Sequence, residues 1–545
     1  MTDMTEIEMS AACYTPLTPL AFLARSAEVF ADKDAIVYGE RHLTYREMAA
    51  QATRVARALQ ASGVLPGDRV AYLLPNIPEM LVAHFAVPLA GAVLVAINTR
   101  LAPAEVLQIC EHSGARMLVV DAGLHPMVAP IADGLTTVKE IVTVTDPAAG
   151  TVPNPDIGGP SYEELLARGS DEPLPWTVDD ERATITINYT SGTTGQPKGV
   201  MYHHRGAYLN SLAEVIHSQH SAESRYLWTL PMFHCNGWCT TWALIAIGGT
   251  HVCLRAVDAD RIWDLLDGAG VTHLNGAPTV LTLMANSTRA HPLDRELVIT
   301  AAGAPPTPTI IKAMEGLGAK IIHVYGLTET YGPYTVCEWQ PGWPGLDADE
   351  RSRMLARQGV GMVVTDGVRV VDPDMNDVPK DGATLGEVVM RGNNVMTGYF
   401  HDPDATEAAF RGGWFHSGDL GVWHPGGYIE LRDRAKDIIV SGGENISTIE
   451  VEAAIASHPA VLEVAVVGVP DDRWGERPKA IVVLREGQHP TERDIIEHVH
   501  GRLARYKAPD HIRFAEGLPK TSTGKIKKFE LREAEWQGRA SRIQG

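Results

Sequence analysis

The stretch that decides the fold is YTSGTTGQPKG, residues 189–199, which combines three glycines, four Ser/Thr hydroxyls and one lysine. It follows an alternating segment, 183–188, that predicts a strand, and it precedes a helix expected to begin near His204. Glycines let the backbone turn tightly and bring N–H groups against a phosphate, while the hydroxyls and Lys198 add further donors. The stretch therefore predicts a polyphosphate-binding loop, although a plain Gly/Ser/Thr surface loop is the ordinary alternative.

This loop differs from the Walker type of nucleotide-binding loop at two positions. Counting from Gly192, Pro197 stands where the Walker motif has its second glycine. Gly199 stands where that motif has the Ser or Thr that binds magnesium. The sequence thus indicates a different class of ATP-binding enzyme.

The chain around the loop is long and has an ordinary globular composition. Its 545 residues exceed what one hydrophobic core usually serves, so at least two domains are expected. Hydrophobic residues make up 45% of the chain, which allows large buried cores. The formal charge of −20 argues against a nucleic acid or an acidic membrane surface as partner, since both attract a basic surface.

The chain carries few signs of export or membrane insertion. Its six cysteines are scattered, which predicts a reduced, cytoplasmic protein without a disulfide framework. The first residues are acidic where a signal peptide needs basic ones. The apolar stretch 80–97 contains His84, Pro88 and Gly91, so a buried helix–turn–strand unit is favoured over a membrane span.

Helical and strand-like patterns alternate up to about residue 430, which predicts α/β layers with mostly parallel sheets flanked by helices. The expected elements in the first part are helices 45–62 and 79–90 and strands 69–74, 92–97 and 116–120. A hairpin around 425–427 precedes the expected domain boundary at Leu431. We expect a large domain over 1–431, a joint over 432–437 and a small α+β domain over 438–545. In the small domain we expect helices 449–457 and 492–503 and strands 461–469 and 479–484.

Further motifs accompany the glycine-rich loop, and they stand in a fixed order along the chain. They are AAGAP (301–305), YGLTET (325–330), HSGDL (416–420), DRAKD (433–437), SGGEN (441–445) and PKTSTGK (519–525). With the loop, these motifs resemble those of the adenylate-forming (AMP-binding) superfamily, in its acyl-CoA synthetase branch. The resemblance spans about 17–532 and implies a large N-terminal domain with a small mobile C-terminal domain. It also implies a reaction of a carboxylic acid, ATP and CoA that yields acyl-CoA, AMP and diphosphate through an acyl-adenylate.

The resemblance assigns roles to particular residues. Lys525 is expected to bridge the carboxylate and the α-phosphate, whereas a solvated basic tail would be the ordinary interpretation of its surroundings. Glu329 and Thr190 are expected to hold magnesium, because hard oxygen ligands suit that ion. The expected catalytic residues are Lys525, Glu329, Thr328 and Lys198. The expected ATP/AMP-binding residues are Thr190, Ser191, Gly192, Thr193, Thr194, Lys198, Gly303, Ala304, Pro305, His323, Tyr325, Gly326, Thr328, Asp419, Arg434 and Lys525.

The acid-binding side of the site is less well defined by the sequence. The stretch PMFHCNGWC, residues 231–239, resembles the acyl-pocket wall of fatty-acid–CoA ligases, so His234, Cys235 and Trp238 are pocket candidates, with ordinary core packing as the alternative. A zinc site there would lack a second ligand pair. By the same resemblance, Lys436 is the expected hinge, and Gly442 and Gly443 are expected to contact CoA.

The residues of these motifs most resemble those of short- and medium-chain acyl-activating enzymes. We therefore expect a short- to medium-chain fatty acid as the substrate. An aryl-CoA ligase and an acyl-AMP ligase that loads a carrier protein remain alternatives, and a homodimer remains open as the assembly.

Overall fold

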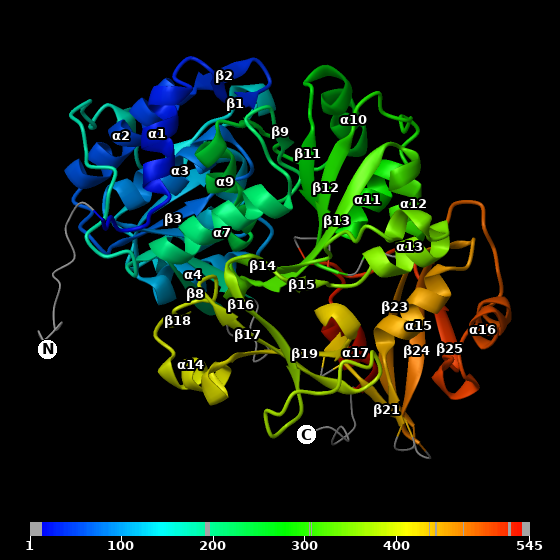
Figure 1. The fold of residues 1–545 in the computed structure, drawn as a ribbon. Helices are drawn as coiled ribbons and strands as arrows, with labels where there is room; N and C mark the ends of the chain where they lie inside the picture. Colours follow the sequence, from blue (N-terminus) through cyan, green and yellow to red (C-terminus); the bar gives the residue numbers. More distant parts are fainter. Residues whose placement is uncertain are drawn as a thin grey trace, which may run out of the picture. The chain divides into compact units, whose positions relative to one another are not determined.

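The computed structural model describes residues 13–190, 197–304, 306, 308–434, 437–441, 444–471, 474–521 and 525–536. The chain forms two compact units, and each contains segments that are distant in sequence (Figure 1). Unit one comprises 1–256, 328–332 and 393–405, and unit two comprises 257–327, 333–392 and 406–545. The expected boundary residue Leu431 lies inside strand β20 (Ile429–Arg434) of unit two.

Unit one contains a seven-stranded sheet that carries the glycine-rich loop. Its strands run in the order β18-β8-β7-β4-β3-β5-β6. The five strands from β7 to β6 pair in parallel, whereas β8 and β18 pair antiparallel. This arrangement confirms the predicted α/β class with mostly parallel pairing. The bounds are β18 (Gly398–Tyr399), β8 (Lys198–His203), β7 (Thr184–Thr190), β4 (Val93–Ala96), β3 (Arg69–Leu73), β5 (Ala115–Asp121) and β6 (Glu140–Val144).

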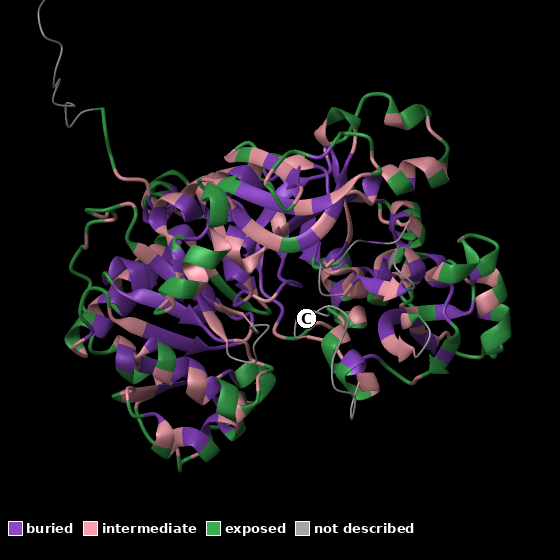
Figure 2. Cartoon of the chain, turned by 90° about the horizontal axis from the view of Figure 1, so that it is seen from below, coloured by how far each residue is buried: buried purple, intermediate pink, exposed green. Residues whose placement is uncertain are grey.

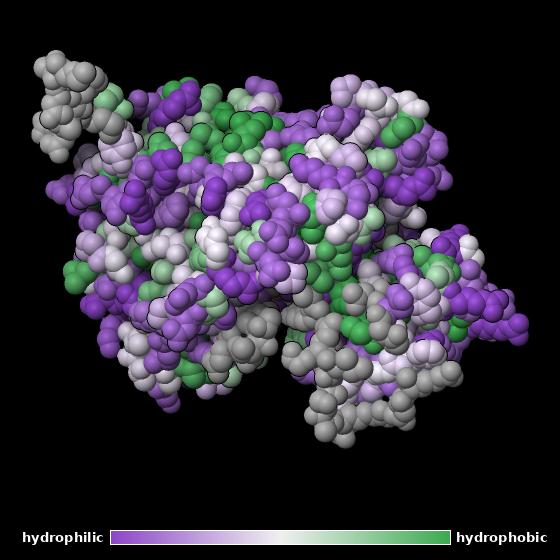
Figure 3. All heavy atoms as spheres, turned by 60° about the horizontal axis from the view of Figure 1, so that its bottom comes forward, coloured by the Kyte–Doolittle hydropathy of each residue, from purple (hydrophilic) through white to green (hydrophobic). Residues whose placement is uncertain are grey.

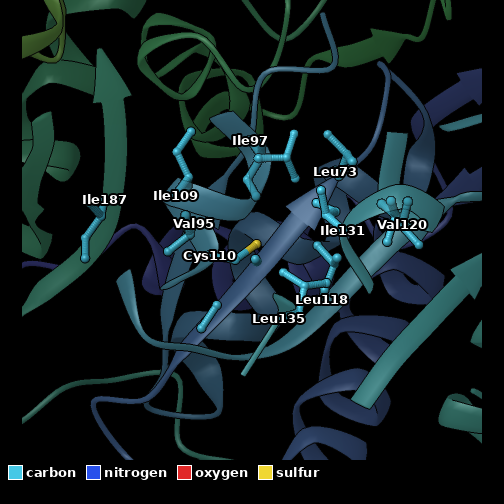
Figure 4. Close-up of a cluster of buried hydrophobic side chains, with 14 of the residues drawn as sticks. Leu73, Val95, Ile97, Ile109, Cys110, Leu118, Val120, Ile131, Leu135 and Ile187 are labelled. Carbon is cyan, nitrogen blue, oxygen red and sulfur yellow. The ribbon is translucent and has the colours of Figure 1, made fainter. Parts of the chain in front are cut away.

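Buried aliphatic side chains on these strands form one face of a core. Parallel strands are covered by helices on both faces, so their sequences are nearly continuous apolar runs, as in VAYL of β3 and MLVV of β5. Figure 4 shows the side chains of this core pointing toward one another from several strands and from helix α4 (Pro103–Ser113). Each such side chain contributes about 1.5–3 kcal/mol on burial. Those labelled are Leu73, Val95, Ile97, Ile109, Cys110, Leu118, Val120, Ile131, Leu135 and Ile187.

The remaining strands of unit one run in the order β9-β10-β1-β2. Helix α2 (Tyr45–Ala61) begins at a capping box formed by Thr44 and Glu47, which confirms the expected helix and explains its first residue. Helix α3 (Pro78–Leu89) is buried along its whole length and leads into β4, which confirms the helix–turn–strand unit. Across the described ranges of the chain, no helix is both long and apolar enough to cross a membrane. The other bounds are β9 (Arg225–Leu227), β10 (Thr250–Val252), β1 (Asp34–Tyr38), β2 (Arg41–Thr44), α1 (Leu20–Val29), α7 (His204–His217) and α9 (Thr240–Ile247).

Unit two contains three groups of strands. The first runs β15-β14-β13-β12-β11, the second is the antiparallel group β16-β17-β19-β20, and the third is β22-β21-β24-β23 with β25 paired to β24. The first and second groups comprise β15 (Val360–Gly361), β14 (Gly332–Val336), β13 (Ala319–Leu327), β12 (Leu297–Ala301), β11 (His273–Gly276), β16 (Thr365–Val371), β17 (Leu385–Gly392), β19 (Phe415–Trp423) and β20. The third comprises β22 (Glu444–Ile446), β21 (Ile439–Ser441), β24 (Gly475–Leu484), β23 (Val461–Asp471) and β25 (His511–Phe514).

The C-terminal strands and helices agree in type with the sequence prediction and differ in length. Helices α15 (Thr448–Ala456) and α16 (Glu492–His500) and the antiparallel pair β23 and β24 occupy the expected positions, and helix α17 (Lys528–Trp536) follows them. Figure 2 shows buried residues concentrated on the strands, while the outer helix faces are exposed. On the face drawn in Figure 3, most described residues at the surface are hydrophilic and the hydrophobic ones are interspersed.

Candidate active site

The glycine-rich stretch connects two antiparallel strands of unit one. Thr190, the last residue of β7, lies directly opposite Lys198, the first residue of β8. Ser191, Gly192, Thr193 and Thr194 lie outside the described residues. The ammonium of Lys198 lies 4.6 Å from the ring centroid of Tyr399, which pairs with β8 through strand β18. A cation over an aromatic face is stabilised electrostatically, so Tyr399 helps to hold Lys198 in place.

Strand β8 was missed from the sequence, which predicted only the helix at His204 after the loop. The helix does begin at His204. The six residues of β8 are short and mixed in polarity, so their pattern alone does not distinguish a strand from a loop. Their strand conformation comes from pairing with β7 and with β18. Strand β18 lies at least 195 residues further along the chain.

Two tyrosines hold the segment that carries Thr328 and Glu329. The Tyr202 hydroxyl donates to the Thr328 carbonyl at 2.5 Å, and the Tyr399 hydroxyl donates to Glu329 Oε1 at 2.9 Å. The Tyr202 ring also stacks on Tyr331, with centroids 3.9 Å apart. Burial and the neighbouring Glu329 carboxylate raise the pKa of Tyr399, so it stays a proton donor at neutral pH. Tyr202 and Tyr399 of unit one thus hold Lys198, Thr328 and Glu329 in place. The sequence analysis did not identify these two tyrosines.

Unit two brings together three of the expected nucleotide-binding residues. Asp419 on β19 and Arg434 on β20 face each other in the strand register, and their Oδ1 and Nε atoms are 3.2 Å apart. The Tyr325 hydroxyl donates to the other Asp419 oxygen at 2.6 Å. The carboxylate therefore has one partner on each oxygen, which fixes its orientation.

The charges of Asp419 and Arg434 also act on Lys525. Its residue is exposed overall, yet desolvation of the ammonium and repulsion by Arg434 lower the pKa of Lys525 to about 8, while Asp419 and Asp437 act to raise it. A lysine with a pKa near neutrality beside fixed charges is typical of a functional site. Lys525 thus interacts electrostatically with Asp419 and Arg434, two of the residues expected to bind the nucleotide.

The other described residues that were expected to bind the nucleotide lie on or near strands β12 and β13. Gly303, two residues after the end of β12, has a positive φ of +89°, and it and Ala304 are exposed. His323 is buried on β13, with Nδ1 2.8 Å from the Arg357 carbonyl, and burial lowers its pKa to about 4. Gly326 is partly buried near the end of the same strand. Pro305, Lys436, Gly442 and Gly443 lie outside the described residues.

The candidate acyl-pocket stretch has an unusual backbone. Five consecutive residues, 235–239, have positive φ values of 47°, 43°, 59°, 56° and 62°. This left-handed turn costs roughly 1–2 kcal/mol for each non-glycine residue, and only Asn236 and Gly237 are of types that adopt it readily. Cys235 and Trp238 are buried and His234 is partly buried. Sequence patterns do not predict such a turn, because it opposes the local preferences of Cys and Trp.

The left-handed turn lies alongside the segment 328–332. Cys235 Sγ is 3.5 Å from Thr328 Oγ1, and Cys239 Sγ is 3.7 Å from the Tyr331 carbonyl. A Cβ built on Gly332 would lie 2.9 Å from Trp238 Cδ1, so only glycine allows this approach. Cys235 is therefore packed against Thr328, which is expected to contact ATP, and Trp238 is packed against Gly332 of the same segment.

Comparisons with known proteins agree with this geometry. The AMP-binding enzyme family matches residues 23–400, and the AMP-binding enzyme C-terminal domain matches residues 450–525. A 2-methylpropanoate–CoA ligase of Humulus lupulus is 42% identical and covers 97% of both chains. A 4-hydroxybutyrate–CoA ligase of Metallosphaera sedula is 43% identical and covers 96% of both chains.

A solved structure of another CoA ligase has the same fold. The anthranilate CoA ligase AuaEII in complex with anthranoyl-AMP superposes with a TM-score of 0.84 at 26% identity, over 97% of this chain and 99% of that one. The chain belongs to the AMP-binding enzyme family. Within that family it is an ATP-dependent, AMP-forming acid–CoA ligase.

Proposed function

We propose that this acid–CoA ligase activates short- to medium-chain carboxylic acids that carry no second charged group. The observation that carries the proposal is its similarity, over nearly the whole chain, to ligases named for 2-methylpropanoate, 4-hydroxybutyrate and acetate. The bulky, uncharged wall around Trp238 supports it, since buried rings leave a short channel and offer no cation to a second carboxylate. A relative named trans-cinnamate:CoA ligase, 41% identical, keeps an aryl acid as the second candidate.

In the proposed mechanism, the chain's own residues reduce the repulsion between two anions. The acid carboxylate must approach the α-phosphate of ATP, and both are negatively charged. Lys525 supplies a cation that reaches both groups, and Lys198 and the loop donors hold the polyphosphate. Asp419 and Arg434 hold the ribose, and Tyr325 packs its ring beside the adenine. Thr328, fixed through its carbonyl by Tyr202, donates its hydroxyl to the α-phosphate.

For the metal we propose that Glu329 and Thr190 hold Mg²⁺. A carboxylate and a hydroxyl are hard oxygen ligands that fit this ion. The Tyr399 hydroxyl on Glu329 Oε1 orients the carboxylate, as ligands are usually oriented by hydrogen-bonded neighbours. When bound, the ion offsets phosphate charge.

We propose that residues 1–431 bind ATP and the acid, that Lys436 is the hinge, and that residues 438–545 move and supply Gly442 and Gly443 to CoA. The cytoplasm is proposed from the scattered, reduced cysteines, although a relative named probable acyl-activating enzyme 5 is described as peroxisomal. A homodimer stays a prediction.

A panel of acids tests the proposed function. CoA-dependent release of AMP is measured for straight-chain acids of increasing length, for branched and hydroxylated short acids, for cinnamate and benzoate, and for dicarboxylates. We expect activity to rise with chain length and then to fall abruptly within the short- to medium-chain range. An optimum at palmitate or longer, or on dicarboxylates, contradicts the proposal, and an optimum on cinnamate or benzoate supports the aryl alternative. AMP release that needs a carrier protein and no CoA would support the carrier-loading alternative.

A further inference from the structure

The left-handed turn, residues 235–239, is held by a buried polar network that its expected role in an acyl pocket does not explain. The turn has little local reason to form, because Cys, Trp and a second Cys all disfavour positive φ. Interactions from elsewhere must therefore hold it. The described contacts of Asn236, in the middle of the turn, supply them.

The Asn236 carboxamide reaches two other elements of unit one, strand β7 and helix α3. Its Oδ1 accepts from Thr186 Oγ1 and from Asn188 Nδ2, each at 2.6 Å, and both residues lie on β7. Its Nδ2 lies 3.0 Å from Nε2 of His84 on α3. The Asn236 backbone N–H donates to Asn188 Oδ1 at 3.2 Å. All four residues are buried.

The network has a single consistent assignment of donors and acceptors. His84 Nδ1 lies 2.7 Å from the Met80 carbonyl, which can only accept, so Nδ1 carries the proton. His84 Nε2 must then accept from Asn236 Nδ2, which leaves Asn236 Oδ1 to accept from Thr186 and Asn188. Burial lowers the pKa of His84 to about 4, so this neutral form persists at physiological pH. Each polar side-chain atom in the network therefore has a partner and none is charged, which favours one fixed geometry.

The network connects both sides of the proposed reaction. Asn188 lies two residues before Thr190, at the start of the polyphosphate loop. The turn held by Asn236 contacts Thr328 through Cys235 and Gly332 through Trp238. A shift of Asn236 would thus move the acyl wall and the Thr328 segment together.

We propose that Asn236 is a positioning residue of this ligase: its carboxamide holds the left-handed turn and thereby sets where Cys235 and Trp238 lie relative to Thr328. The inference rests on the proposed function, in that it takes the turn as the wall against which the acid binds. It differs from a pocket-lining role, because Asn236 itself acts through the turn.

The central test compares Asn236→Gly with a destabilised control. Glycine adopts positive φ freely, so this variant removes the network and keeps the backbone accessible. Leu118→Ala, in the core of Figure 4, is the control for a loss of stability away from the turn. For both proteins we measure the melting temperature, kcat/KM for the acid in ATP–pyrophosphate exchange, and the profile of activity against chain length.

We expect Asn236→Gly to lose at least tenfold in kcat/KM for the preferred acid and to flatten the chain-length profile, while Leu118→Ala keeps the wild-type profile. Asn236→Ala should be worse, because alanine also disfavours the positive φ. An Asn236→Gly profile and kcat/KM equal to those of Leu118→Ala would overturn the proposal.

A milder variant keeps the proposal testable if Asn236→Gly does not fold. Thr186→Val is nearly isosteric and removes one donor to Asn236 Oδ1. It should change the profile in the same direction by a smaller factor, and an unchanged profile in a folded Thr186→Val protein would then overturn the proposal. If the wild type prefers palmitate or an aryl acid, the proposed substrate is wrong, yet the same variants measured on that acid still decide the role of Asn236.

Discussion

The buried network around Asn236 in unit one contains no charged group, whereas the cluster around Asp419 in unit two consists largely of charged groups. In the first, buried amide, hydroxyl and imidazole groups form hydrogen bonds with one another. In the second, Asp419 pairs with Arg434, and both charges act on the pKa of Lys525. A neutral network of buried hydrogen bonds resists change, while a charged cluster can respond to an anionic ligand. We therefore expect the first to set geometry and the second to set the rate of the chemical step.

The largest expected effect comes from removing the Lys525 ammonium. Lys525→Ala should slow adenylation by about 100- to 1000-fold, the usual loss when one donor to developing charge is removed. It should still convert supplied acyl-adenylate to acyl-CoA, because that half-reaction does not need the cation at the α-phosphate. Single-turnover assays of each half-reaction measure the two rates.

Lys527→Ala is the matched control, because Lys527 belongs to the same basic run and pairs with Glu530 at 2.8 Å. It should leave both half-reactions near wild type. Equal losses in the two half-reactions of Lys525→Ala would show that Lys525 does not act in adenylation alone.

A smaller effect is expected at Asp419, the ion-pair partner of Arg434. Asp419→Asn keeps the shape of the side chain and removes the charge that faces Arg434, so the KM for ATP should rise about tenfold, as for loss of one charge-assisted hydrogen bond. Steady-state kinetics at saturating acid and CoA give this value. Asp377→Asn, which removes an exposed partner of Arg369 in unit two, should leave the KM for ATP within about twofold. An unchanged KM in Asp419→Asn would remove Asp419 from the nucleotide site.

The two regions should also differ in their response to pH. Lys525 must be protonated to act, and its pKa of about 8 means that the cation is lost as pH rises through that value. Adenylation kcat/KM, which reports the free enzyme, should fall roughly tenfold per pH unit above about pH 8. Lys525→Arg should move this fall to higher pH, and Asp419→Asn should move it lower, because Asp419 raises the Lys525 pKa.

Asn236→Gly should leave the same alkaline limb in place, since its network holds no group that titrates there. If Asn236→Gly moved the alkaline fall in kcat/KM and Asp419→Asn left it unchanged, the roles expected for the two regions would be reversed.

The smallest effect is expected at the acyl wall itself. Trp238→Ala should move the fall of activity toward longer acids, each added methylene gaining about 0.8 kcal/mol, or roughly fourfold, until the channel ends. The panel of straight-chain acids measures this shift. Trp238→Phe keeps an aromatic ring and should shift the profile less, while an unchanged profile in Trp238→Ala would place the acid elsewhere.

Local signals explain which elements could be predicted. The capping box of α2, the apolar run of β3 and the alternation before the glycine-rich loop lie within a few residues of the features that they predict. The order of the motifs was enough to indicate the family and the reaction. Strand β8 could not be found, because its conformation depends on β18, far along the chain.

The sequence by itself therefore determined the class of enzyme, the helices and strands with strong local patterns, and the identity of Lys525, Asp419, Glu329 and Lys198 as candidates. Only the tertiary structure decided that Asp419 on β19 faces Arg434 on β20 and that both charges act on Lys525. It also decided the left-handed turn at 235–239, against the preferences of its own residues. The physical reason is that Asn236 is held by partners 48, 50 and 152 residues away, and their combined hydrogen bonds offset a local strain that no pattern in the turn reveals.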